Sequence, residues 1–264
     1  AGFSCLPGGM ANPGLMTPEQ SLYNVTSALI LAGAIGFPIL VNFKDIITGR
    51  LNAVWCAITR HRRRDIPLHT WDLNTKLVLV TTLSILAVAS VAFFILEYNN
   101  TLAGMTLWQK VSQSVFNSLI PRSAGFASVN PADFLPLTLL LVIVQMWIGG
   151  ASQSLAGGIK VNTVATVFLN VRSVLSGGSR PWAFDRRLSL NSVRRANTVI
   201  VLAIVSFLII LAIVMCCEPA LGLKAMVFEV SSALFTVGSS LGATPMLCDT
   251  TKAVSYTHLT LPTI

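Results

Sequence analysis

The sequence predicts an all-α polytopic membrane protein, truncated, made of repeated units that each hold a span, a short half-helix, a glycine loop and a second span. Three observations predict this class: the composition, four long runs without charge, and a loop that recurs along the chain. Of the 264 residues, 53% are hydrophobic and 11% are charged, whereas an ordinary soluble domain has about 25% charged residues. With a mean hydropathy of +0.72, this composition excludes an ordinary soluble enzyme.

Four runs free of Asp, Glu, Lys and Arg are each long enough to cross a bilayer as a helix. A hydrocarbon core of roughly 30 Å needs about 20 helical residues. Leu, Ile, Val and Ala occupy all sides of these runs rather than one stripe, which suits a helix surrounded by lipid or by other helices. The runs lie between Glu19 and Lys44, between Lys76 and Glu97, between Asp133 and Lys160, and between Arg195 and Glu218.

Basic residues gather in two segments between these runs. Residues 50–76 and residues 172–195 hold most of the Arg side chains of the chain. Basic residues beside spans are retained on the cytoplasmic side, so both segments are predicted to be cytoplasmic loops. Topology and attraction to anionic lipid therefore explain the net charge of +8, and no nucleic-acid partner is predicted.

Two shorter apolar segments are each followed by a loop that contains glycine. Residues 107–120 and 225–235 are too short to cross a bilayer, and such segments beside full spans are candidates for re-entrant helices. Glycine loops follow them at Gly125 and Gly238, and a third copy opens the chain at Gly2. The three glycines lie 123 and 113 residues apart, which indicates a repeated unit.

A glycine loop at membrane depth has a physical use. Irregular backbone is tolerated there only where it is buried in protein or lines a water-filled cavity. Glycine accepts dihedral angles that turn successive carbonyls toward an ion, and rings of carbonyls replace the hydration shell of a monovalent cation. The half-helices, ending at Ile120 and Phe235, would add partial negative charge. The recurring loop therefore predicts a cation pathway.

Another glycine-rich stretch interrupts the third charge-free run. Gly149, Gly150, Gly157 and Gly158 lie within ten residues, and each glycine inside a helix costs about 1 kcal/mol relative to alanine. The span is predicted to unwind there, and a close contact between small residues of two helices is the alternative. Lys160 ends the stretch, where it would repel a cation, hold the stretch to a carbonyl or carboxylate, or extend to the interface.

The sequence lacks the patterns of an enzyme or a metal centre. None of the five cysteines forms a CxxC pair, and the three histidines are scattered outside the long runs. The stretch 149–160 lacks the Gly-Lys-Ser/Thr signature of a phosphate-binding loop. No catalytic residue, cofactor or metal site is predicted, apart from a transported ion.

These motifs resemble those of the Trk/Ktr/HKT superfamily of potassium, and in some members sodium, transporters. Proteins of that superfamily carry four span, pore-helix, span repeats in one chain, similar in plan to a potassium channel. The resemblance implies a fragment that runs from the end of the second repeat to the pore loop of the fourth. It rests on Ala1-Gly2-Phe3-Ser4, Arg122-Ser123-Ala124-Gly125-Phe126, the glycine-rich stretch 149–160, and Phe235-Thr236-Val237-Gly238-Ser239.

The resemblance also implies a role for each of these motifs. The ion-coordinating filter would comprise Gly2, Ser123, Ala124, Gly125, Thr236, Val237 and Gly238. An intramembrane gate loop beneath the filter would comprise Gly149, Gly150, Ser152, Gln153, Ser154, Gly157, Gly158 and Lys160. Ala151, Ser152, Gln153 and Leu155 depart from the Ser, Pro, Gly and Thr common in the superfamily. Arg122 is expected to support the filter by tying its loop down through bidentate hydrogen bonds.

The expected organisation follows from the spans and from the resemblance. It comprises a filter loop and closing span of repeat 2 (1–49), a basic loop (50–76), repeat 3 (77–175), a second basic loop (176–195) and the start of repeat 4 (196–253). The last segment, 254–264, resembles a translated sequencing adapter and is expected to be non-native. The resemblance implies a plasma-membrane protein in contact with lipid, a homodimer, and a cytosolic nucleotide-binding regulatory subunit of the TrkA/KtrA type near the basic loops.

The function expected from these features is potassium uptake through a carbonyl-lined filter. A sodium-conducting member of the same superfamily is the first alternative. A proton-coupled carrier or a membrane-embedded enzyme is the second, and it requires ionisable residues inside spans, for which Glu229 and Lys160 are the candidates.

Overall fold

The computed structural model describes residues 9–15, 19–58, 73–154, 156–177, 181–184, 186–219 and 221–242. The expected filter residue Gly2 and the segment 254–264 lie outside these residues. The elements are η1 Gly9–Ala11, η2 Pro13–Leu15, α1 Ser21–Ile35, α2 Phe37–Ile58, α3 Leu73–Glu97, α4 Leu107–Leu119, η3 Pro131–Asp133, α5 Pro136–Trp147, α6 Val161–Leu175, β1 Trp182–Ala183, β2 Arg186–Arg187, α7 Leu190–Cys217 and α8 Leu223–Leu234.

Two helices in the described part of the chain, α3 and α7, are long and apolar enough to cross a membrane by themselves. They contain 25 and 28 residues, and at about 1.5 Å per residue both exceed a hydrocarbon core of roughly 30 Å. Val201, Leu208 and Ile209 of α7 are exposed, as expected of a helix that faces lipid. The protein is an all-α polytopic membrane protein. In the second basic segment, the described residues also form a short antiparallel hairpin, β1–β2, with two residues in each strand.

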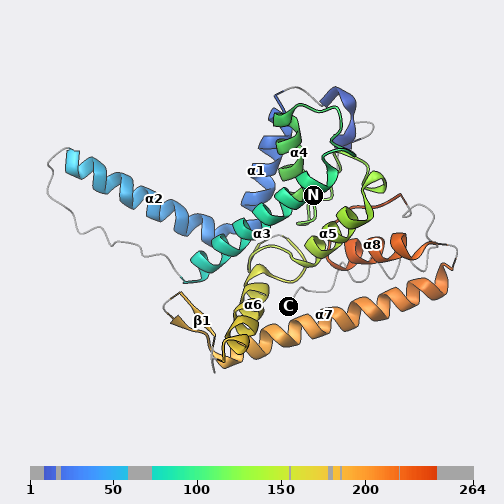
Figure 1. The fold of residues 1–264 in the computed structure, drawn as a ribbon. Coiled ribbons are helices and arrows are strands. Elements are labelled where there is room, and N and C mark those ends of the chain that lie inside the picture. Colours follow the sequence, from blue (N-terminus) through green and yellow to red (C-terminus); the bar gives the residue numbers. More distant parts are fainter. Residues whose placement is uncertain are drawn as a thin grey trace.

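The first charge-free run does not form one straight span, which corrects the sequence-based expectation. Helices α1 and α2 meet at Gly36 at an angle of 102°, and α2 extends away from the other helices (Figure 1). Gly36 has a φ of +87°, and a Cβ there would lie 3.3 Å from the carbonyl oxygen of Gln153. The run bends because glycine accepts this left-handed conformation and lets the loop 148–160 pass against the backbone.

The third charge-free run unwinds where the glycines predict. Helix α5 ends at Trp147 and α6 begins at Val161. The loop between them is closed at its neck, where the N–H of Gly149 donates to the carbonyl of Ile159 at 2.9 Å and the N–H of Val161 donates to the carbonyl of Gly150 at 2.9 Å. These bonds hold 148–160 as one folded loop between two helices rather than as a continuous helix.

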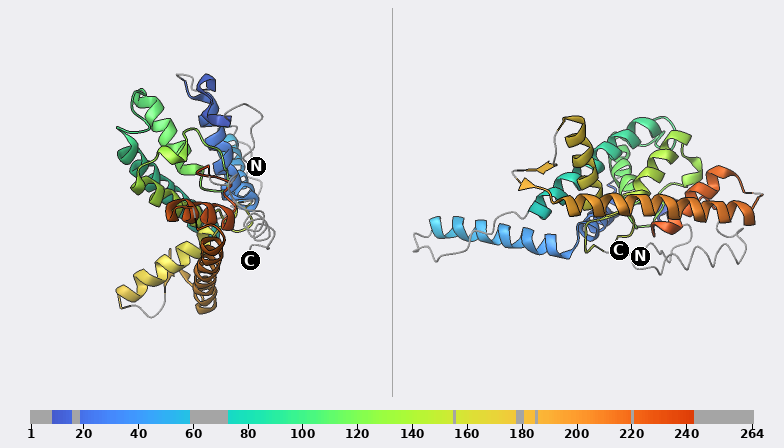
Figure 2. Two further views of the ribbon diagram at one scale, coloured as in Figure 1. Left: turned by 90° about the vertical axis from the view of Figure 1, so that its right-hand side faces the viewer. Right: turned by 90° about the horizontal axis from the view of Figure 1, so that it is seen from below.

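The two short apolar segments form helices α4 and α8, within two residues of the predicted bounds. Helix α4 packs between α1 and α3, and α8 packs against α5 and α7. Figure 2 shows the long helix α7 running past α8 and the other short helices. Buried apolar side chains, including Phe93, Met146 and Phe228, form the core among them. This core holds the end of α8 through Phe235, and a separate cluster that contains Tyr23, Phe116 and Ile120 holds the end of α4.

Candidate functional site

The glycine loop at Gly125 (residues 123–125) and the glycine loop at Gly238 (residues 236–238) lie side by side. A Cβ on Gly125 would lie 2.8 Å from the carbonyl oxygen of Val237 and 3.3 Å from that of Gly238. A Cβ on Gly238 would in turn lie 3.8 Å from the Cα of Gly125. The fold therefore brings two loops that are 113 residues apart in sequence into backbone contact, and a side chain at Gly125 would disturb that contact.

Both loops have the same backbone pattern. φ is +60° at Ser123 and +67° at Gly125, and it is +55° at Thr236 and +82° at Gly238. Positive φ is uncommon for residues other than glycine and costs roughly 1–2 kcal/mol, so the surrounding structure must enforce it at the serine and the threonine. Left-handed residues at alternate positions turn successive peptide planes in ways that neither a helix nor a strand allows. The sequence repeat is thus also a conformational repeat.

The short helices end directly at these loops. The N–H of Ala124 donates back to the carbonyl of Ile120 at 3.2 Å, and the N–H of Val237 donates back to the carbonyl of Ser232 at 2.9 Å. The N–H of the middle residue of each loop thus points back toward the short helix that precedes the loop, α4 for Ala124 and α8 for Val237. The partly negative C-terminal ends of α4 and α8 lie beside the loops, an arrangement that favours a cation over an anion.

A side chain from each short helix braces the loop that follows it. After α4, Ser128 Oγ donates to Asn117 Oδ1 at 3.1 Å. After α8, Ser240 Oγ donates to Glu229 Oε1 at 2.5 Å, and the N–H of Leu241 donates to the same oxygen at 3.0 Å. Both serines stand 11 residues after their partners. The sequence analysis missed these braces, although a polar residue within a short apolar helix was a signal for them.

The loop 148–160 touches the first residue of both glycine loops. The N–H of Gly157 donates to Ser123 Oγ at 2.9 Å. A Cβ on Gly157 would collide with Thr236 Oγ1 and lie 2.8 Å from the carbonyl oxygen of Phe235. Ser123 Oγ and Thr236 Oγ1 are themselves 3.5 Å apart. Gly157 is thus the point where three segments meet, and the site has no room there for any side chain.

Other described glycines of this loop are packed against neighbouring backbone. A Cβ on Gly149 would collide with the carbonyl oxygen of Gly157, and Gly158 has a φ of +75°. A Cβ on Gly150 would lie 2.7 Å from the carbonyl oxygen of Ala34 and would collide with Ser154 Oγ, while Ser152 and Gln153 are exposed.

Lys160 closes the loop on itself. Its Nζ donates to the carbonyl oxygen of Ala156 at 2.6 Å, which is the second of the three arrangements considered from the sequence. Because a charged donor strengthens a hydrogen bond, this contact stabilises the end of the loop that leads into α6.

Arg122 is buried beside the loop that follows α4. Its side chain is 4% exposed and its Nη1 has no hydrogen-bond partner, so the expected support would have to come from the other guanidinium nitrogens. The backbone N–H of Arg122 donates to the carbonyl of Leu119 at 3.0 Å. Within the described part of the chain, this main-chain bond and the pair of Ser128 with Asn117 hold the loop.

Two short helices, α4 and α8, end at adjoining glycine loops beside two helices, α3 and α7, that are long and apolar enough to cross a membrane. This arrangement places the protein in a class of polytopic membrane proteins with paired short helices and loops. No group of three or more His, Cys, Asp or Glu side chains that could hold a metal ion occurs in the described residues. The TrkH family, described as cation transport proteins, matches residues 1–263. The chain belongs to this family of cation transport proteins.

Individual relatives agree with this assignment. The chain is 30% identical over 253 residues to the potassium/sodium uptake protein NtpJ of Enterococcus hirae, covering 94% of this chain and 51% of the relative. It is 31% identical over 257 residues to the Ktr system potassium uptake protein B of Bacillus subtilis, covering 96% and 52% respectively. The chain thus spans about half the length of these relatives.

A solved structure has the same fold. The potassium transporter TrkH of Vibrio parahaemolyticus superposes with a TM-score of 0.73 and 17% sequence identity, over 98% of this chain and 52% of that one. At this identity the match shows the fold alone.

Proposed function

We propose that the chain forms part of a potassium uptake pathway across the plasma membrane, with its glycine loops as segments of a selectivity filter. The observation that carries this proposal is the contact between Gly125 and Gly238, with matching positive φ in both loops. The names of the relatives support potassium as the ion, since one is a Ktr potassium uptake protein.

The ion would be held by main-chain carbonyl oxygens. The carbonyls of residues 123–125 and 236–238 would replace part of its hydration shell, and the loop at Gly2 would supply the equivalent carbonyls of the second repeat. The ends of α4 and α8 favour a cation there electrostatically. Such a filter needs main-chain atoms only.

The loop 148–160 would act as the gate. It contacts both glycine loops through Gly157, and the hydrogen bond from this residue to Ser123 contributes about 1 kcal/mol. A few contacts of that size would hold the loop under the filter and still allow a regulatory partner to displace it. Lys160 would keep the far end of the loop folded as it moves.

The proposed setting of this pathway is a homodimeric membrane subunit whose segments 50–76 and 172–195 face the cytoplasm. A cytosolic nucleotide-binding regulatory subunit would dock near these segments. The chain would contribute the closing segment of one repeat (1–49), bent at Gly36, a complete repeat (77–175) and the start of the next (196–253).

Sodium conduction is a second candidate, because the relative from Enterococcus hirae is named a potassium/sodium uptake protein. One experiment separates the two ions. The complete coding sequence that carries this chain, expressed with its partner in cells without their own potassium uptake systems, should restore growth at low potassium.

The variant Gly125→Ser tests the filter itself in the same cells. It should lose this growth or shift uptake toward sodium. Sodium uptake by the unaltered protein in preference to potassium would establish the second candidate. Failure of the well-expressed protein to transport either ion would overturn both.

A further inference from the structure

We propose that a cavity between the first turns of α3, α6 and α7 binds a glycerophosphate group, as found in phosphatidylglycerol or in free glycerol phosphate, and that its occupancy holds the gate loop closed. The gating part of this inference rests on the proposed function, whereas the binding part stands on the cavity itself. The cavity has a volume of about 350 Å³, which is within the usual range for small-ligand sites.

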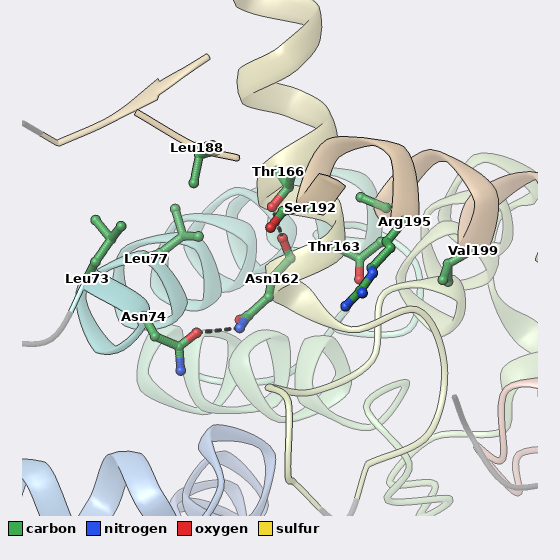
Figure 3. A pocket seen from close by; sticks show the side chains of 11 residues that line it. Leu73, Asn74, Leu77, Asn162, Thr163, Thr166, Leu188, Ser192, Arg195 and Val199 are labelled. Carbon is green, nitrogen blue, oxygen red and sulfur yellow. Dashed lines mark hydrogen bonds between the residues drawn. The ribbon is translucent and has the colours of Figure 1, made fainter. Parts of the chain in front are cut away.

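The lining of the cavity is amphipathic (Figure 3). Leu73, Leu77 and Val199 form apolar walls, and polar side chains occupy the region around the start of α6. A lipid headgroup has the same division, with a charged phosphate next to glycerol carbons. The proposed topology puts this end of the three helices at the cytoplasmic surface, where anionic headgroups lie and where basic pockets between spans bind them.

The charge of the lining favours an anion. Among the described residues that line the cavity, Arg195 is the one cation and none is a carboxylate. The hydroxyl of Thr163 and the amide of Asn74 lie on the same lining. A guanidinium and nearby polar hydrogens are the donors that a phosphate prefers.

A buried acceptor adds a second requirement to the ligand. Asn162 Nδ2 donates to Asn74 Oδ1 and thereby joins α6 to α3, but Asn162 Oδ1 is buried and has no hydrogen-bond partner among the described residues. Leaving such an oxygen unsatisfied costs free energy. A ligand that carries a hydroxyl next to its phosphate would satisfy both Asn162 and Arg195, and glycerophosphate has this combination.

The cavity is linked to the gate loop through the start of α6. Asn162 and Thr163 follow directly after Lys160, the last residue of that loop. The N–H of Val161 donates to the carbonyl of Gly150 at 2.9 Å and so closes the neck of the loop. A ligand that holds α6 against α3 and α7 stabilises this neck. It therefore favours the conformation in which Gly157 contacts the filter, since a ligand shifts an equilibrium toward the state that it binds better.

Potassium flux into vesicles tests the inference on the complete protein. The protein is reconstituted in phosphatidylcholine alone or with phosphatidylglycerol added, and free glycerol phosphate is supplied to phosphatidylcholine vesicles in a third arm. Arg195→Ala removes the proposed phosphate contact. Arg194→Ala is the matched control, because this neighbouring arginine is exposed like Arg195 but is not among the residues that line the cavity.

We expect phosphatidylglycerol or free glycerol phosphate to lower the flux and to raise the thermal midpoint of the protein. Arg195→Ala should weaken either effect about tenfold in ligand concentration, as expected for the loss of one charged contact, and Arg194→Ala should not. An effect of the lipid alone identifies a headgroup, and an effect of the free compound identifies a soluble ligand.

Equal responses of the two arginine variants would overturn the site. Absence of any response to both ligands, in vesicles that transport potassium, would overturn this inference alone. Absence of potassium flux in phosphatidylcholine would instead count against the proposed function, and the thermal midpoints would still report on binding.

Discussion

Replacing Gly125 by alanine should damage ion selection far more than stability. An L-residue in the left-handed conformation costs roughly 1–2 kcal/mol, and φ at this position is +67°. The new methyl group would also lie 2.8 Å from the carbonyl oxygen of Val237, which is too close, so the two loops must separate by a few tenths of an ångström. Because about 1.4 kcal/mol corresponds to a factor of ten, we expect at least about a tenfold loss in potassium flux or in potassium over sodium selectivity.

Gly104→Ala provides the matched control for this change. Gly104 also has a positive φ, +80°, but a Cβ there would meet nothing within 4 Å. The control variant therefore carries the conformational cost without the contact with the other loop. Gly125→Ala should lose at least as much stability as Gly104→Ala in thermal unfolding of the purified protein, because it carries the close contact in addition to the conformational cost.

Ion flux in vesicles under opposed potassium and sodium gradients should separate the two variants. Only Gly125→Ala should change the ratio of the two fluxes. If Gly125→Ala transports and selects like the unaltered protein at equal expression, or if Gly104→Ala changes the flux ratio as much, the assignment of this loop to the filter is wrong.

Three further changes test the gate, the brace and the bend. Gly157→Ala places a methyl group against Thr236 and should push the loop 148–160 away from the glycine loops. Potassium leak in the absence of the regulatory partner should then rise. An unchanged leak would show that this loop is not the gate. Glu229→Gln weakens the 2.5 Å bond from Ser240 by about 1–2 kcal/mol and should lower the potassium to sodium permeability ratio, whereas loss of expression with an unaltered ratio would show a folding role only. Gly36→Ala forces alanine to a φ of +87° and should lower the free energy of unfolding by about 1–2 kcal/mol; an unaltered thermal midpoint would contradict the described bend.

The sequence was sufficient to predict the elements of the site because their signals are local. Absence of charge marks the spans α3 and α7, short apolar length marks α4 and α8, and clustered glycines mark the break after Trp147. Each signal reflects the free energy of a residue in a given environment. None requires knowledge of which segments meet.

The features that the sequence did not predict depend on tertiary contacts. A charge-free run shows that residues can enter lipid, but it does not show that Gly36 turns the chain around Gln153. The pairing of Glu229 with Ser240 requires the loop geometry that follows the short helix. The hydrogen bonds expected of Arg122 came from its residue type and from the family resemblance, and neither indicates that its Nη1 is buried without a hydrogen-bond partner.

A cross-link between the two glycine loops would test the central claim most directly. Ser123 Oγ and Thr236 Oγ1 are 3.5 Å apart, so the double variant Ser123→Cys/Thr236→Cys places two thiols within reach of a bridging Cd²⁺ ion or of a disulfide. If both loops line one potassium pathway, Cd²⁺ or oxidation should block potassium flux in the double variant alone, and chelation or reduction should restore it. A bridge that forms without any change in flux would show that the two loops do not line the pathway, and failure of a bridge to form in the folded transporter would contradict their contact.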